Sequence, residues 1–427
     1  MAAAIGLVDC NNFFTSCEQA FNAALTNRPV IVLSNNDGNV IARSKEAKAL
    51  GIKMGEPVFK VRGLIEKYGV EVFSSNYELY GDMSARVMEI LSDFTPEIEI
   101  YSIDEAFIRM EAFVSLDPSN GGSLPDQGHA IREKIRRWTG IPVSVGIATN
   151  KTLAKVANFF AKRSDKAKGC LDLTDSPYLD LALERLPIGE VWGVGPRYAQ
   201  LLINHGIGNA RQLRDAPDDW IRKQMTIVGL RTVQELRGIR CLPLETTAAT
   251  RKSITVSRSF GNSVESLDDL RAAVAYYVSR AAEKLRRESL AAGMINVFIE
   301  TDRFRPEPQY SNSVTLEVAP KTDSTPELRE MAFKGLVAIF RAGYRYKKAG
   351  VLLSDLVPAD TLTLPLWDRE QSERMKRMMT AVDELNGKFG RDAVRCGMFA
   401  LKGRWSTRVG QRSPRYTTRW GELMRVR

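Results

Sequence analysis

The sequence has few of the residues that carry histidine- or thiol-based chemistry. It contains two histidines, His129 and His205, and five scattered cysteines that form no C-x-x-C pair. This leaves little room for a histidine-based active site and gives no sign of a zinc ribbon or a disulfide framework. We therefore expect buried, reduced thiols and a chemistry that depends on carboxylates and lysines.

Long hydrophobic runs are also missing. No apolar stretch approaches the roughly 18 residues of a membrane span, and the first residues lack the basic region and cleavage site of a signal peptide. With 44% hydrophobic and 26% charged residues, the composition is that of a soluble globular chain. The 427 residues allow roughly two to four domains, and we expect a cytoplasmic protein.

The charge is unevenly distributed. The formal net charge is +10 and the pI is near 9.3, which favours a polyanionic partner such as nucleic acid. Most of the excess lies in residues 401–427, where Glu422 is the one acid among eight basic residues.

The first part of the chain has an α/β pattern. Strands are predicted for 5–8, 30–33 and 143–148, and helices for 12–21, 44–50, 82–94 and 131–138, with another helix beginning near Lys151. Residues 97–110 alternate apolar and polar as a hairpin does, with the bend at 102–105. A new unit is expected to open near Gly81, and residues 118–128 are expected to form a loop.

The second part predicts a helical lobe followed by a mixed unit. Residues 178–240 contain short helices broken by glycine and proline. From Ser253 the predicted order is strand 254–260, helix 267–288, strand 296–300, strand 313–318, helix 326–342 and strand 351–356. This is a β-α-β-β-α-β unit. Residues 359–427 have no clear fold pattern.

Three carboxylates stand at the ends of predicted strands. Asp9 ends the first strand, and Asp104 and Glu105 stand at the hairpin bend. If these strands are neighbours, the acids converge, and bound divalent cations would relieve their repulsion, with oxygen ligands favouring Mg²⁺ or Mn²⁺. Spacing alone leaves a second interpretation open, in which Asp9 caps a turn and Glu105 is solvated.

Longer motifs carry a resemblance to a known family. Leu7-Val8-Asp9-Cys10-Asn11-Asn12-Phe13-Phe14 together with Tyr101-Ser102-Ile103-Asp104-Glu105-Ala106 resembles the paired metal motifs of Y-family translesion DNA polymerases. Residues 34–38, 74–80, 257–261 and 413–419 are similar to blocks of the UmuC subfamily, the catalytic subunits of bacterial DNA polymerase V. The resemblance extends over nearly the whole chain.

The resemblance implies a metal site and a nucleotide site. Two Mg²⁺ ions would bind Asp9 and Asp104, with Glu105 on the ion that activates the primer hydroxyl and the Cys10 carbonyl completing the nucleotide-side position. Phe14 would be the steric gate that excludes a ribose 2′-OH, where UmuC-type chains usually carry tyrosine.

Other residues complete the implied nucleotide site. Phe13, beside the gate, is expected to lie mostly in the core. Lys48 and Lys162 would bind the triphosphate. Lys162 shares a predicted helix face with Lys151, Lys155 and Asn158, and a solvated basic face is the alternative.

DNA contacts are implied in three places. Trp192, Gly193 and Gly195 resemble a helix-hairpin-helix, whose glycines let backbone amides approach a phosphate. Arg258 would contact the duplex from a sheet. Leu364, Leu366 and Trp367 resemble the peptide that docks bacterial polymerases onto the sliding clamp, and a hydrophobic linker is the alternative.

The implied fold class is α+β and multidomain, in the form of a right hand. It would comprise a palm (1–13 and 81–169), fingers (14–80), a helical thumb (170–243), a linker (244–252), a β-α-β-β-α-β little finger (253–358) and a basic C-terminal tail (359–427).

The implied function is error-prone translesion synthesis in SOS mutagenesis. The chain would add dNMP from a dNTP to primer-template DNA, with a processed UmuD-type dimer, RecA and the sliding clamp as partners. Two alternatives are a non-catalytic DNA-binding scaffold derived from a polymerase, and a two-metal nuclease, for which a steric gate would have no use.

Overall fold

The chain forms two compact units. The computed structural model describes residues 4–110, 123–247, 250–361, 369–390, 392–395, 405 and 409–424. The first unit takes its residues from 1–34, 38–248 and 411–427, and the second from 35–37 and 249–410. Within the described residues, no helix has the length and apolarity that crossing a membrane requires.

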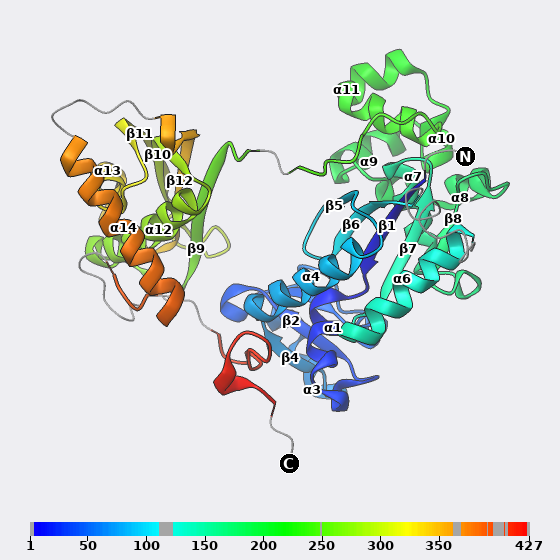
Figure 1. Ribbon diagram of the computed structural model, residues 1–427, viewed down its shortest axis with the longest axis horizontal. Coiled ribbons are helices and arrows are strands. Elements are labelled where there is room, and N and C mark those ends of the chain that lie inside the picture. The colour runs from blue at the N-terminus through cyan, green and yellow to red at the C-terminus, as the bar shows by residue number, and fades with distance from the viewer. Residues whose placement is uncertain are drawn as a thin grey trace. The chain divides into compact units, whose positions relative to one another are not determined.

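The first unit is built on a five-stranded sheet with the order β5-β6-β1-β7-β8 (Figure 1). The strands are β1 Ile5–Cys10, β5 Ile98–Ile100, β6 Glu105–Arg109, β7 Val143–Ala148 and β8 Cys170–Asp172. Strand β1 is central, antiparallel to both β6 and β7, and every one of its residues is buried. A strand covered on both faces reads as a continuous apolar run, as this one does up to Asp9.

Helices cover the two faces of this sheet. They are α1 Phe13–Ala20, α4 Tyr77–Ser92, α6 Leu124–Thr139 and α7 Lys151–Ala161. Val8 and Cys10 belong to the core formed with α1, α4 and α6, whereas Leu7 belongs to the core formed with α7. Because side chains alternate along a strand, Asp9 lies on the same face as Leu7, the face that α7 covers.

Two smaller parts extend the first unit. A three-stranded sheet, β3-β2-β4, packs against two short helices, and four helices form the lobe that follows β8. Their elements are β2 Val30–Leu33, β3 Val40–Arg43, α2 Lys45–Ala49, α3 Val58–Tyr68, β4 Glu71–Ser74, α8 Leu179–Arg185, α9 Pro196–Asn204, α10 Ala210–Arg214 and α11 Asp218–Leu236.

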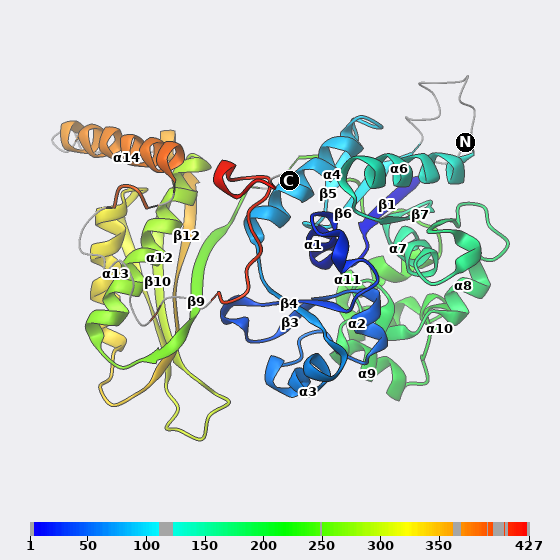
Figure 2. The ribbon, with the colours of Figure 1, turned by 90° about the horizontal axis from the view of Figure 1, so that it is seen from below.

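The second unit is a four-stranded antiparallel sheet with the order β11-β10-β12-β9. Helices α12 and α13 lie along one face of it (Figure 2). Its elements are β9 Ser253–Val264, α12 Leu267–Arg287, β10 Leu290–Thr301, β11 Ser311–Thr322, α13 Thr325–Ile339, β12 Tyr346–Pro358 and α14 Arg369–Phe389. Arg286 of α12 forms two hydrogen bonds with Asp383 of α14, at 2.7 and 2.9 Å.

Most predicted elements are confirmed. The hairpin is formed by β5 and β6, and the order of the second unit is β-α-β-β-α-β. The expected buried thiols are confirmed for Cys10, Cys17 and Cys170, while Cys241 is a free cysteine of intermediate exposure.

Three predictions were wrong. The loop assigned to 118–128 is helical from Leu124, because Ser123 and Asp126 form a capping box that starts α6 early. The helix predicted for 82–94 begins earlier, because α4 starts at Tyr77 and runs through Gly81. The region 359–427, which gave no fold pattern, contains the helix α14, and the ion pair of Asp383 with Arg286 of α12 helps to stabilise it.

Candidate active site

The end of β1 brings the three predicted carboxylates onto neighbouring backbone. Asp9 lies directly opposite Glu105 in the antiparallel register of β1 and β6. Asp104 occupies the bend just before β6, and its carbonyl accepts the backbone N–H of Cys10 at 2.8 Å. Residues directly opposite on antiparallel strands project their side chains on the same face, so Asp9 and Glu105 face α7 together.

Ser102 fixes the shape of the bend. Its hydroxyl oxygen accepts the backbone N–H groups of Asp104 at 3.3 Å and Glu105 at 3.1 Å. The same hydroxyl donates to the Asp104 carboxylate at 2.6 Å. A serine at this position therefore holds two adjacent acids at the point where the strand turns, which allows both to serve one site.

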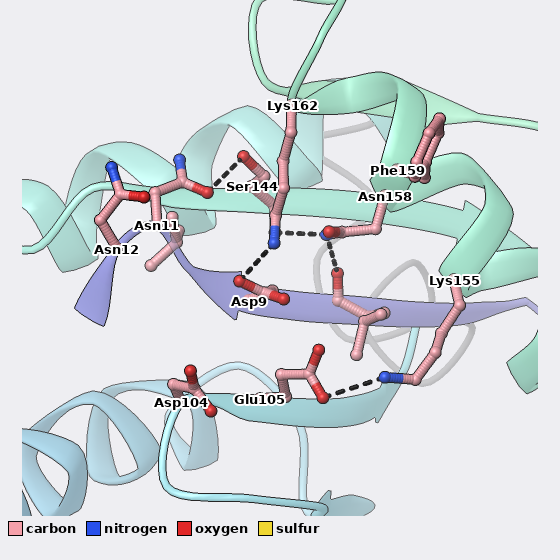
Figure 3. A network of polar contacts seen from close by, with 12 residues as sticks. Asp9, Asn11, Asn12, Asp104, Glu105, Ser144, Lys155, Asn158, Phe159 and Lys162 are labelled. Carbon is pink, nitrogen blue, oxygen red and sulfur yellow. Dashed lines mark hydrogen bonds and ion pairs between the residues drawn. The ribbon is translucent and has the colours of Figure 1, made fainter. Parts of the chain in front are cut away.

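Two lysines of the α7 region reach the carboxylates (Figure 3). Lys162, directly after α7, pairs with Asp9 at 2.6 Å, and Lys155 pairs with Glu105 at 2.9 Å. Between them Asn158 is buried and donates to the Leu7 and Ser144 carbonyls, at 3.3 and 2.9 Å. The polar face of α7 is therefore turned toward the sheet, and the alternative of a solvated basic face is wrong for Lys151, which is 3% exposed.

Burial makes the charge on Asp9 costly. It raises the pKa of Asp9 to about 7, with the nearby Lys162 ammonium opposing the rise and Glu105 adding to it. Burial also acts to raise the pKa of Glu105, but a hydrogen bond with Asp9 and the Lys155 charge outweigh it and hold that pKa below its usual value. A cation bound between the two strands, close to both carboxylates, would therefore stabilise this pair of acids.

The donor set suits a hard divalent cation, although the side chains do not form a ready ligand shell. All the predicted ligands, including the Cys10 carbonyl, are oxygen atoms, the type that Mg²⁺ prefers. Within the described part of the chain, no three His, Cys, Asp or Glu side chains are grouped as a metal cage. Asp9 and Glu105 are instead paired with lysines, and Asp104 accepts the Ser102 hydroxyl.

The predicted nucleotide residues lie around the first turn of α1. Phe13 is buried, as expected, and Phe14 is partly exposed. The ring of Phe14 stacks on Tyr80 with centroids 4.5 Å apart and an interplanar angle of 15°, and its edge meets Tyr77. Both tyrosines lie in the 74–80 block that resembles UmuC-type chains, but the sequence assigned them no role, because stacking between α1 and α4 has no signature in either helix alone.

Lys48 completes a cationic cluster. Its ammonium donates to the Asn12 side chain. Burial lowers the pKa of Lys48, and the nearby charges of Arg43, Lys162 and Arg163 lower it further. Four cations that repel one another in this way form a place where a polyphosphate would be stabilised.

The segment that resembles a helix-hairpin-helix turns at Gly193 and leads into α9. Gly193 has φ 89°, in the left-handed region that glycine favours, and Gly195 precedes α9 with Pro196 in its first turn. The Trp192 ring packs on Tyr101 and Phe107 and its Nε1 donates to the Tyr101 hydroxyl at 3.1 Å. That contact joins the helical lobe to the carboxylate bend.

Two further predicted sites have different outcomes. Arg258 lies in β9, partly buried, opposite Ala349 of β12. Leu364, Leu366 and Trp367 lie outside the described residues.

The fold is that of Y-family DNA polymerases. The Y-family DNA polymerase chimera Dbh-Dpo4(243-245)-Dbh matches with a TM-score of 0.66 and 22% identity, covering 83% of this chain and 99% of that one. The structure titled insertion ternary complex of Dbh DNA polymerase matches with a TM-score of 0.55 and 21% identity, covering 83% and 99%.

Sequence relatives define the family more closely. The model of the impB/mucB/samB family matches residues 8–158, the model of that family's C-terminal domain matches 251–366, and a domain of unknown function matches 376–426. Protein UmuC of Salmonella typhimurium is 42% identical over 424 residues, covering 99% of each chain. Protein MucB of Escherichia coli is 39% identical, covering 98% of each chain. The chain belongs to the impB/mucB/samB family.

Proposed function

We propose that this chain, an error-prone translesion DNA polymerase by family and fold, adds dNMP units to a primer through two-metal catalysis at Asp9, Asp104 and Glu105. The observation that carries the proposal is the register that sets Asp9 opposite Glu105 at the end of a buried strand, with Asp104 at the adjoining bend. A buried acid whose pKa is near 7 is an acid that a cation would stabilise.

Two Mg²⁺ ions would be held by the Asp9, Asp104 and Glu105 carboxylates and by the Cys10 carbonyl. Such ions lower the pKa of the attacking hydroxyl and compensate the charge that develops on the triphosphate. The lysines now paired with Asp9 and Glu105 would then be released to other anions, and Lys162 would bind the triphosphate together with Lys48.

The aromatic residues would select the sugar. Phe14 stacks flat against Tyr80, which backs its ring and limits its movement. A ring held in that position would leave no space for a 2′-OH, so a dNTP would be favoured over an rNTP. The phenylalanine in place of tyrosine removes a hydroxyl and keeps the ring that does the excluding.

DNA and protein partners complete the proposal. The glycines Gly193 and Gly195 would bind a phosphate of the primer-template through their backbone amides, and Arg258 would contact the duplex. The proposal extends to the partners that the family resemblance implies, a processed UmuD-type dimer, RecA and the sliding clamp, with the clamp bound through Leu364, Leu366 and Trp367.

Primer extension tests the proposal. The assay would use an abasic template, dNTPs and Mg²⁺, with and without the UmuD-type dimer and RecA. Metal-dependent extension is expected. Loss of primer length instead would favour the nuclease alternative. DNA binding with no extension in any condition would favour the scaffold alternative.

A further inference from the structure

The described end of the chain, Gln411–Met424, docks on the first unit, and we call it the C-terminal clasp (red in Figures 1 and 2). Its first residue pairs with the end of β4. The Gln411 carbonyl accepts the backbone N–H of Ser74 at 3.0 Å, and the Gln411 N–H donates to the Ser74 hydroxyl at 2.9 Å. Backbone groups of the clasp thus contribute to its contact with the first unit, in addition to the side-chain contacts described below.

Asn76 ties the clasp to the start of α4. Its side-chain N–H group donates to the Ser413 carbonyl at 3.0 Å, to the Ser413 hydroxyl at 2.9 Å and to the Pro414 carbonyl at 3.1 Å. Its side-chain oxygen accepts the backbone N–H of Leu79 and so caps α4. Asn76 is 1% exposed, and one buried amide thus serves the helix and the clasp together.

Glu18 ties the clasp to α1. One oxygen of this carboxylate accepts both the Ser413 hydroxyl at 2.9 Å and the Tyr80 hydroxyl at 2.6 Å. Glu18 and Ser413 are 2% and 6% exposed, so each hydrogen bond forms out of water, where a missing partner is costly. Tyr80 is the residue on which Phe14 stacks.

Two outer contacts grip the same pair of helices. Arg415 pairs with Glu78 of α4 at 3.3 Å and with Glu422 inside the clasp. The Tyr416 ring stacks on Phe21, just after α1, with centroids 4.9 Å apart. The clasp thus contacts α1 and α4, the two helices that carry Phe14 and Tyr80.

We infer that the C-terminal clasp is a positioning element for sugar selection, in which Ser413 fixes Glu18, Glu18 fixes the Tyr80 hydroxyl, and the Tyr80 ring supports Phe14. This inference rests on the proposed role of Phe14 as the gate. It gives a role to the end of the segment that matches a domain of unknown function.

The physical reason is the steepness of steric exclusion. A ring excludes a hydroxyl only while it cannot retreat, and small displacements of a positioning group change rates strongly. Loss of the Ser413 hydroxyl leaves Glu18 with one donor fewer and lets Tyr80 move. Extension with dNTPs needs no such tight fit and is expected to change little.

The test compares single-nucleotide insertion of a dNTP and the matching rNTP by full-length variants, in the conditions that support wild-type extension. The variants are Ser413→Ala, Tyr80→Phe, their double mutant and Phe14→Ala. The matched control is Thr418→Ala, an exposed hydroxyl of the same clasp. We expect Ser413→Ala to lower the preference for dNTP over rNTP by about tenfold, mainly through the KM for rNTP, with kcat for dNTP retained.

The outcomes separate the clasp from the gate. A double mutant no worse than Tyr80→Phe alone supports one relay, because coupled residues are not additive. Unchanged discrimination in Ser413→Ala, with relaxed discrimination in Phe14→Ala, overturns the clasp and leaves the gate intact. Unchanged discrimination in Phe14→Ala overturns the proposed gate, and the inference falls with it. A loss equal for dNTP and rNTP in Ser413→Ala assigns the clasp to stability alone and also overturns the inference.

Discussion

Asp9 and Glu235 are both buried acids of the first unit, yet their surroundings differ in one respect. Glu235, fully buried in α11, accepts four hydrogen bonds, from the backbone N–H and hydroxyl of Thr152 and from the N–H groups of Cys241 and Leu242. Asp9 has the Lys162 ammonium and the neighbouring acid Glu105. Three backbone N–H groups and one hydroxyl stabilise the Glu235 carboxylate, and the backbone holds the three N–H groups in place. The Asp9 carboxylate is stabilised mainly by the partly exposed side chain of Lys162.

The difference separates a structural acid from a site that can accept a ligand. Thr152 lies in the first turn of α7, so Glu235 supplies an acceptor and a negative charge at the start of that helix. The other end of α7 leads to Lys162, which holds Asp9. Glu235 stabilises the start of α7, and α7 positions Lys155 and Lys162 beside Glu105 and Asp9.

The largest effect is expected at an acid that we propose as a metal ligand. Asp104→Asn keeps the size of the side chain and removes its charge, so extension should fall by about 10³-fold or more while DNA binding remains. Primer extension with a DNA-binding measurement checks this. The control is Asp219→Asn, an exposed acid of α11, which should extend as the wild type does. Near-wild-type extension by Asp104→Asn would contradict the proposed role of this acid in binding metal.

The second effect concerns stability. Glu235→Ala leaves the buried N–H and hydroxyl of Thr152 and the partly buried N–H groups of Cys241 and Leu242 without an acceptor. We expect the free energy of unfolding to fall by about 3 kcal/mol. Urea denaturation followed by tryptophan fluorescence measures it. Glu184→Ala, which removes an exposed acid paired with Arg211, should change stability by less than about 0.5 kcal/mol. Equal losses of unfolding free energy in the two variants would show that the hydrogen bonds of Glu235 contribute no more to stability than an exposed ion pair does.

The third effect tests whether Lys162 binds the triphosphate. Lys162→Ala should raise the KM for dNTP by about tenfold, because a triphosphate ligand would be lost, with a smaller change in kcat. Steady-state insertion kinetics check it, with Lys166→Ala as a control at an exposed lysine nearby. A fall in kcat with KM unchanged would instead place Lys162 in orienting Asp9.

The smallest effect is a pH dependence. Burial raises the pKa of Glu18, with the Tyr80 and Ser413 hydrogen bonds opposing the rise. Between its unfolded pKa and the raised folded value, the folded state binds more protons, so the contribution of Glu18 to stability is lost as pH rises. Glu18→Gln has no such loss. The stability of the variant relative to the wild type should therefore increase with pH across that window, as denaturation at several pH values would show. A constant difference would contradict the raised pKa.

Sequence patterns predicted the order of elements in the second unit better than the residues at which each element begins and ends. The helix over 267–288 was visible because its apolar residues repeat every three or four positions, and the structure has α12 at Leu267–Arg287. Strand β10 begins at Leu290 rather than at 296, since Ala291 and Ala292 give no alternating signal. Helix α14 was missed because contacts with α12, such as that of Asp383 with Arg286, stabilise it.

The candidate site was predicted only in part, because local patterns reveal residues within a motif but not contacts between distant residues. Asp9, Asp104 and Glu105 lie in short motifs, so sequence could name them. Glu235 and Ser413 contact α7 and Glu18 from distant positions in the chain. Ser413 lies in a block that resembles UmuC-type chains, but no local pattern shows that it or Glu235 will be buried beside a helix formed elsewhere.

The sequence by itself determined most of the elements, the acids at strand ends and the lysines spaced along α7, because strand and helix periods are local properties of the chain. Only the tertiary structure decided that Asp9 faces Glu105, that the lysines turn inward to meet them and that the C-terminal clasp packs against the helices of Phe14 and Tyr80. Those facts depend on strand register and on contacts between residues far apart in sequence, which burial and hydrogen bonding select together once the chain is folded.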